Sequence, residues 1–246
     1  MTKGVAIFGA TSAIAQATAR AFASEGARFF LVGRNRERLE AVAADLAVRG
    51  ASEVRVHVAD FLAIEDWTAL CATAKEALGT IDIALVAHGT LPDQAACERD
   101  ETALRDALAV NFLSYANLLL GLAGILEAQG SGSLVAIGSA AGDRGKRRNY
   151  VYGAAKAGIA VIQQGLMGRL TRAGVHVLLV KPGFVDTPMT AEFAKGPLWI
   201  GPDRAAVAIV DGIRRRRSTI YVPWFWRWIM FALRLLPDRV FARLDL

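Results

Sequence analysis

The sequence predicts an α/β domain: one doubly wound parallel sheet of about seven strands with helices on both faces. Three observations support this fold class. The chain has 246 residues, 54% of them hydrophobic, which is enough for one substantial core. Short apolar runs alternate with Ala-rich helical stretches, and the runs are apolar on both faces, as in strands of a buried parallel sheet. No linker-like segment divides the chain, so one catalytic domain over 1–222 and a C-terminal extension over 223–246 are expected.

The strands and helices follow in alternation along the chain. The predicted strands are Val5–Phe8, Ala27–Val32, Glu53–Val58, Ile81–Ala87, Ser133–Gly138, Val175–Val180 and Ile220–Val222. The predicted helices are Ala13–Glu25, Arg36–Arg49, Ile64–Leu78, Glu101–Gln129 and Tyr152–Ala173.

Composition excludes several classes of protein. With 54% hydrophobic residues and only 21% charged residues, the chain is not disordered. Its two cysteines, Cys71 and Cys97, have no CxxC spacing and no nearby histidine, so neither a metal site nor a disulfide framework is expected. The N-terminus runs directly into the first strand without a signal pattern, and a cytoplasmic location is expected.

The net charge of +6 is concentrated at the C-terminal end. Residues 1–213 carry 21 basic and 21 acidic residues, whereas residues 214–246 carry eight arginines against two aspartates, Asp238 and Asp245. Tryptophans 224, 226 and 228 alternate with these arginines, a composition typical of a membrane interface rather than of nucleic-acid binding. The apolar segment Trp224–Leu236 would span about 20 Å as a helix, too short to cross a bilayer. Peripheral contact with the inner face of the plasma membrane is therefore expected, with a second subunit as the alternative partner.

The turn after the first strand is built from small residues. Gly9, Thr11, Ser12, Ala13 and Ile14 lie where a chain of this class lets backbone N–H groups approach a pyrophosphate. The same residue types also suit an ordinary helix start.

The ends of the second and third strands carry further candidates. Arg34 stands where an NAD-preferring protein usually has an acid, and a guanidinium suits a ribose 2′-phosphate. NADP(H) is therefore favoured, with NAD(H) as the alternative. Asp60 either binds the adenine amine or caps the next helix.

A later group of polar residues carries the chemistry. Tyr152 and Lys156 are one helical turn apart, and Ser139 stands thirteen residues before the tyrosine at the end of a strand. Asn111 interrupts an otherwise strong helix, and Pro182-Gly183 follows the sixth strand.

With these residues the sequence resembles the short-chain dehydrogenase/reductase family over residues 3–222, which implies a Rossmann-like fold and a catalytic tetrad of Asn111, Ser139, Tyr152 and Lys156. We also expect a homodimer or homotetramer. The family's first turn, TGxxxGxG, keeps only Gly9 here, and its NNAG segment is replaced by Val86-Ala87-His88-Gly89. The cofactor contacts implied are Gly9, Thr11, Ser12, Ala13, Ile14, Arg34, Asp60, Phe61, Ala87, His88, Gly89, Tyr152, Lys156, Pro182, Gly183, Val185 and Thr187.

A narrower resemblance concerns residues 139–153, 223–227 and 236–241. They are similar to the decaprenylphosphoryl-2-keto-ribose reductases, which implies a 2-keto sugar on a polyprenyl phosphate as substrate. The basic residues Arg144, Lys146, Arg147 and Arg148 then form either a phosphate clamp at the mouth of the site or a solvated loop.

The expected reaction is reduction of a ketone to a secondary alcohol. Tyr152 would give the proton, Lys156 would lower the phenol pKa, Ser139 would hold the carbonyl oxygen and Asn111 would organise a water. Two alternatives remain: a soluble dehydrogenase for another small ketone or alcohol whose tail is a lid or subunit contact, and a dinucleotide-binding regulator.

Overall fold

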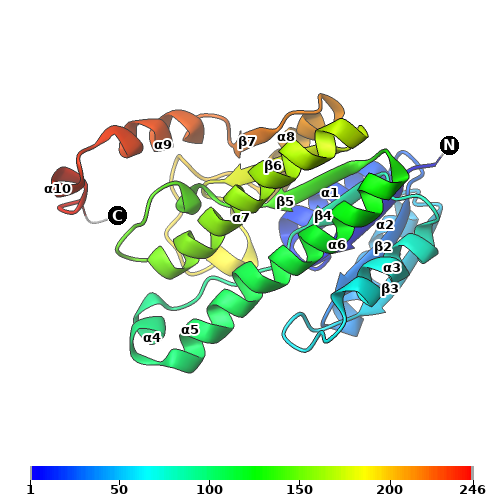
Figure 1. Ribbon diagram of the computed structural model, residues 1–246, viewed down its shortest axis with the longest axis horizontal. Coiled ribbons are helices and arrows are strands. Elements are labelled where there is room, and N and C mark those ends of the chain that lie inside the picture. Colours follow the sequence, from blue (N-terminus) through cyan, green and yellow to red (C-terminus); the bar gives the residue numbers. More distant parts are fainter. Residues whose placement is uncertain (1, 245–246) are drawn as a thin grey trace.

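The computed structural model describes residues 2–244 and contains one seven-stranded sheet in which all neighbouring strands are parallel (Figure 1). The strand order is β3-β2-β1-β4-β5-β6-β7. The strands are β1 Gly4–Phe8, β2 Arg28–Gly33, β3 Glu53–Val58, β4 Ile83–Val86, β5 Ser133–Ile137, β6 His176–Pro182 and β7 Thr219–Val222. The predicted doubly wound parallel sheet is confirmed.

Helices fill the connections between the strands, and two more follow the last strand. They are α1 Ala13–Ala23, α2 Arg36–Val48, α3 Trp67–Leu78, α4 Gln94–Arg99, α5 Glu101–Leu108, α6 Ser114–Gln129, α7 Tyr150–Leu170, α8 Pro202–Arg214, α9 Trp226–Leu235 and α10 Asp238–Phe241. Short turns are η1 Ala109–Leu113, η2 Ala140–Asp143, η3 Thr171–Ala173 and η4 Pro188–Thr190. Of the expected C-terminal extension, residues 245 and 246 lie outside the described residues.

Each face of the sheet has its own buried layer. One layer joins the strands to α1, α2 and α8 and includes Phe22, Leu39 and Ile209. The other joins them to α3, α6 and α7 and includes Leu118 and Ile159. This two-sided burial explains why the central strands β1, β4 and β5 are apolar without alternation, whereas the edge strand β3 alternates valine with polar residues and is only partly buried.

The predicted helix Glu101–Gln129 is divided by the π-helical turn η1. By length and hydropathy this stretch could cross a membrane, but its side chains Tyr115, Leu118 and Leu122 are buried in the protein core. The stretch therefore packs as a core helix. Its π turn carries Asn111, and such turns are frequent at functional sites.

The strand order reverses between β1 and β4. Phe8 is paired with Val32 of β2 on one side and with Val86 of β4 on the other, so the loops after these strands open in opposite directions. The crevice at this switch point, outside the carboxyl ends of the strands, is the usual binding position in open α/β sheets.

Candidate active site

A pocket of about 830 Å³ opens at the carboxyl ends of β1, β4, β5 and β6. Its lining starts at Gly9 in the first turn and includes Ser139, Tyr152 and Lys156. The last residue that lines it is Trp226 in α9. The pocket thus joins segments from the two ends of the chain.

The first turn forms a close-fitting cradle. Gly9 has φ +89°, and a Cβ at this position would lie 2.4 Å from the backbone nitrogen of His88, so only glycine fits. The N–H groups of Gly9 and Ala10 donate to the carbonyl of Val32, which fixes the turn. Ser12 precedes α1 but its side chain makes no capping hydrogen bond. The start of α1 therefore faces the pocket without a side-chain cap, which fits a pyrophosphate.

The end of β2 places two arginines at the pocket. Arg34 and Arg38 both line it, and both are solvent-exposed. Asp60 and Phe61, after β3, also line it. The Asp60 carboxylate accepts a hydrogen bond from the Leu62 N–H at 3.0 Å, so it stabilises its own turn rather than capping α3, which Asp66 caps.

The loop after β4 is held by Asn111. Its amide nitrogen donates to Thr90 Oγ1 and to the carbonyl of Ala107, while its Oδ1 accepts from the Thr90 N–H at 3.0 Å. These bonds fix Thr90 and its neighbour Gly89 beside Lys156. The side chain is fully buried, so its structural role is to position this loop; organising a water stays a prediction.

His88 lies in the same loop and is held by a hydrogen bond to Ser114. Ser114 Oγ donates its hydrogen to the Val110 carbonyl, so it must accept from His88 Nε2, 2.7 Å away. Nε2 of the imidazole therefore carries a proton, while Nδ1 is buried without a partner among the described residues. Burial and the charge of Lys156 hold its pKa well below the usual range.

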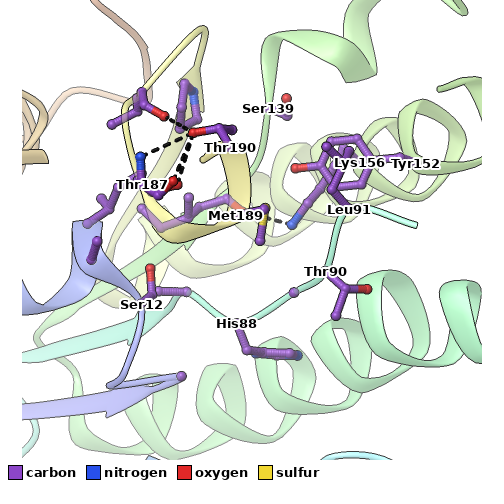
Figure 2. Close-up of a pocket in the computed structure, with 18 of the residues that line it drawn as sticks. Ser12, His88, Thr90, Leu91, Ser139, Tyr152, Lys156, Thr187, Met189 and Thr190 are labelled. Carbon is purple, nitrogen blue, oxygen red and sulfur yellow. Dashed lines mark hydrogen bonds between the residues drawn. The ribbon is translucent and has the colours of Figure 1, made fainter. Parts of the chain in front are cut away.

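Ser139, Tyr152 and Lys156 meet on one side of the pocket, with the turn that carries Thr187 and Met189 across from them (Figure 2). Ser139 Oγ accepts from the Ala141 N–H at 3.1 Å. Lys156 Nζ donates to the Ile137 carbonyl at 3.2 Å and lies 5.7 Å from the centre of the Tyr152 ring.

Burial is the largest influence on the pKa values of Tyr152 and Lys156. Burial raises the pKa of Tyr152 to about 12, although a hydrogen bond with Ser139 opposes the rise. Burial lowers the pKa of Lys156 to about 7. The lowering of the phenol pKa expected from Lys156 is not found: burial raises this pKa, and it is Ser139 that opposes the rise. At neutral pH the phenol keeps its proton, while the amine is close to its own midpoint.

The segment after β6 forms the facing wall. Pro182, Gly183, Val185 and Thr187 all line the pocket. Thr190 Oγ1 donates to the Val185 carbonyl at 2.8 Å and accepts from the Thr187 N–H at 3.1 Å. This turn is therefore internally fixed before any ligand binds.

The C-terminal segment completes the pocket. Trp226 of α9 is buried, and it packs edge-on against Phe184 with ring centres 4.7 Å apart. A Cβ on Gly183 would lie 2.1 Å from Trp226 Nε1, so the indole requires glycine there. Met230 and Ala140 extend this small core. The tail thus forms a wall of the pocket.

Arg144 holds this wall in place. Its guanidinium donates to the carbonyls of Leu233 and Leu236, forms an ion pair with Asp238 and covers the ring of Phe241 at 4.0 Å. We call these contacts the Arg144 clasp. They connect the catalytic loop after Ser139 to the last two helices.

A buried trio fixes the base of the same loop. Asp143 forms an ion pair with Lys181 and accepts from the Tyr221 hydroxyl at 2.6 Å. Burial and Asp143 raise the pKa of the Tyr221 phenol, which stays protonated and keeps this bond. The loop is thereby tied to β6 and β7.

Comparison with known proteins decides the family. Residues 3–197 match the family model for short chain dehydrogenases. The chain belongs to this family. It is therefore an oxidoreductase of the short-chain dehydrogenase type.

Individual relatives support the assignment. The chain is 37% identical over 243 residues to an uncharacterized oxidoreductase of Mycobacterium tuberculosis, covering 98% of this chain and 96% of the relative. It is 39% identical over 248 residues to one of Streptomyces coelicolor, with the same coverage. A short-chain dehydrogenase from Sphingobium yanoikuyae in complex with NADPH shares 25% identity, with a TM-score of 0.84 over 98% of this chain and 96% of that one. An actinorhodin polyketide ketoreductase with NADPH, at 23% identity and a TM-score of 0.82 over 92% of this chain and 97% of that one, shares the fold.

The four basic residues at positions 144–148 fall into two groups, which the sequence did not indicate. Lys146 and Arg148 line the pocket of this short-chain dehydrogenase. Arg144 does not, because its guanidinium is committed to the clasp, and Arg147 is an exposed residue outside the lining. Arg144 is therefore not available for the expected phosphate clamp, whereas a contact between Arg147 and a phosphate stays a prediction. Burial lowers the pKa of Lys146, and Asp143 opposes this.

The other expected site residues all line this pocket except Asn111, which lies behind the loop it holds. Sequence reasoning missed Arg38, although its place in the first turn of the helix that follows Arg34 is a usable signal. It also expected Trp226 to contact a membrane. The sequence shows that this helix face is apolar, but not which surface covers it.

Proposed function

We propose that this short-chain dehydrogenase is an NADP(H)-dependent ketoreductase that converts a ketone to a secondary alcohol. The observation that carries the proposal is the convergence of Ser139, Tyr152 and Lys156 in a pocket that begins at the Gly9 cradle. The bound nicotinamide supplies the hydride.

The cradle and the arginines fit that cofactor. The uncapped start of α1 suits the pyrophosphate, and Arg34 with Arg38 suits a 2′-phosphate. The NADPH complex of the relative from Sphingobium yanoikuyae supports this choice over NAD(H).

The protein's own groups then handle the proton. Ser139 Oγ accepts from a backbone N–H, and its own hydrogen, which is directed to Tyr152 before substrate binds, turns to the substrate oxygen. Tyr152, protonated at neutral pH because burial raises its pKa to about 12, donates its hydroxyl proton to that oxygen. Lys156, with a pKa lowered to about 7, returns a proton to the phenolate.

For the substrate we propose an amphiphilic ketone, a 2-keto sugar carried on a polyprenyl phosphate. Phe184, Met189 and Phe193 line the pocket while remaining exposed, which provides an apolar mouth for a lipid chain. Lys146 and Arg148 add two cations suited to a phosphate. The second candidate is a small soluble ketone enclosed by the tail, favoured by the position of Trp226 in the wall. Assembly as a homodimer or homotetramer stays a prediction.

The test is NADPH oxidation with a panel of ketones, comparing Tyr152→Phe with Tyr150→Phe. Tyr150 is a matched control because its hydroxyl donates to Glu98 at 2.9 Å and does not line the pocket. We expect Tyr152→Phe to reduce kcat by about 1,000-fold, within the range for loss of a general acid, and Tyr150→Phe to retain activity. Equal activity of the two variants, or no reduction of any ketone by the wild type, would contradict the proposal.

A further inference from the structure

Helix α9 carries two apolar faces, and only one is used inside the protein. The inner face packs on the pocket through Trp226, Ile229, Met230 and Leu233. At 100° per residue the other apolar side chains lie about 180° away. They form an outer stripe of Trp228 (59% exposed), Phe231 (56%) and Leu235 (68%), and Trp224 (72%), in the turn just before the helix, extends it.

The position of the outer stripe and the charges beside it indicate which kind of surface it binds. Figure 1 shows α9 at the edge of the molecule, beyond β7. Arg227 and Arg234 are seven residues apart and flank the stripe on one side, and both are exposed. Asp238 is the one acid among residues 223–244, and the clasp pairs it with Arg144. The outer face therefore presents aromatic rings and two arginines that form no ion pair within the part of the chain that the structure describes.

From this we propose that the outer stripe docks the protein on an anionic lipid surface. Tryptophan favours the boundary between headgroups and acyl chains, and arginine side chains reach headgroups while their stems stay with apolar atoms. A second copy fits less well. A two-fold contact through the same stripe would bring Arg227 and Arg234 of both copies together, and among the described residues of the tail, 223–244, the one acid, Asp238, is already paired with Arg144.

Docking through the outer stripe would also hold the active site close to the lipid surface. Trp226 lines the pocket from the opposite side of the same helix, so the pocket stays within about 10 Å, one helix diameter, of the lipid surface. This link to substrate delivery rests on the proposed function, since it presumes a lipid-linked ketone. Lipid binding itself does not depend on that reaction.

The experiment is co-sedimentation of the full chain with vesicles of phosphatidylcholine, with and without phosphatidylglycerol. We expect binding to the anionic vesicles that weakens at high salt. Trp228→Ser with Phe231→Ser should weaken binding about 100-fold, since each half-exposed ring loses part of its burial in lipid. Arg227→Gln with Arg234→Gln should weaken it about 30-fold, at roughly a five-fold loss for each arginine.

Matched controls distinguish nonspecific hydrophobic adsorption to vesicles from docking through the outer stripe. Val48→Ser and Val207→Ser remove exposed apolar side chains from α2 and α8 and should leave vesicle binding unchanged. All variants should retain wild-type turnover of a water-soluble ketone, which shows that they fold.

Three outcomes overturn the inference. They are no vesicle binding by an active wild type, equal loss in the control variants, or a stripe variant that only converts a dimer to a monomer in sedimentation velocity. The first leaves the proposed reductase function intact. Vesicle binding without reduction of any ketone would instead remove the proposed function and keep the docking surface.

Discussion

Replacing Arg144 by alanine should release α9 and α10 from the catalytic loop. The side chain is 13% exposed and makes two charged hydrogen bonds to the carbonyls of Leu233 and Leu236. At about 1.5 kcal/mol each, the loss is about 3 kcal/mol. Asp238 is fully exposed, at 103%, so its ion pair adds little. A loss of about 3 kcal/mol corresponds to a rise of about 150-fold in the undocked population.

The assay is amide hydrogen exchange resolved to α9, in the wild type, Arg144→Ala and Arg147→Ala. Arg147 lies in the same loop but is exposed and outside the pocket lining, so it is the matched control. We expect exchange in α9 to accelerate by about 100-fold only in Arg144→Ala, with the strands unaffected. If α9 exchanges equally in both variants, the clasp does not hold the tail.

Three further predictions concern the cofactor, the buried amine and the tail contact. Arg34→Asp should weaken NADPH binding at least about 10-fold relative to NADH, whereas Arg36→Asp, outside the pocket, should not; fluorescence titration of both cofactors decides. Because the pKa of Lys156 falls from 10.5 to about 7 on folding, the unfolded chain binds one more proton between these values. The urea midpoint of the wild type should therefore rise from pH 7 to pH 9 relative to Lys156→Met, and parallel curves would exclude this linkage. Gly183→Ala forces the Trp226 indole to move and should cost about 1–3 kcal/mol by overpacking, measured by thermal unfolding; an unchanged Tm would contradict the contact.

The sheet could be predicted because its signal is local. The central strands are apolar runs buried on both faces, and the edge strand β3, which alternates Val with polar residues, agrees with the predicted strand Glu53–Val58 at both ends. The spacing of Tyr152 and Lys156 is likewise a property of one helix. Their convergence with Ser139 follows once that residue is placed at the end of β5.

The tail could not be predicted in the same way. An apolar helix face indicates that the face is covered, but it does not indicate whether protein or lipid covers it. Arg144 contacts Leu233 across 89 residues of sequence, and its charge was equally compatible with a phosphate. The π turn at Asn111 depends on how two helical segments fit against the core, which helix propensity alone does not indicate.

The position of Trp226 in the chain has a consequence for biosynthesis. The central strands are all present once β6 ends at Pro182, yet the tryptophan that closes the pocket follows 44 residues later (226 minus 182). At translation rates of about 5–20 residues per second, this interval is about 2–9 s. During that time the sheet can form while Phe184 and Ala140 lack their cover. We therefore expect a nascent chain of this enzyme to expose the apolar flank around Phe184 and Ala140 until Trp226 covers it, and an exposed apolar surface of this kind favours chaperone binding.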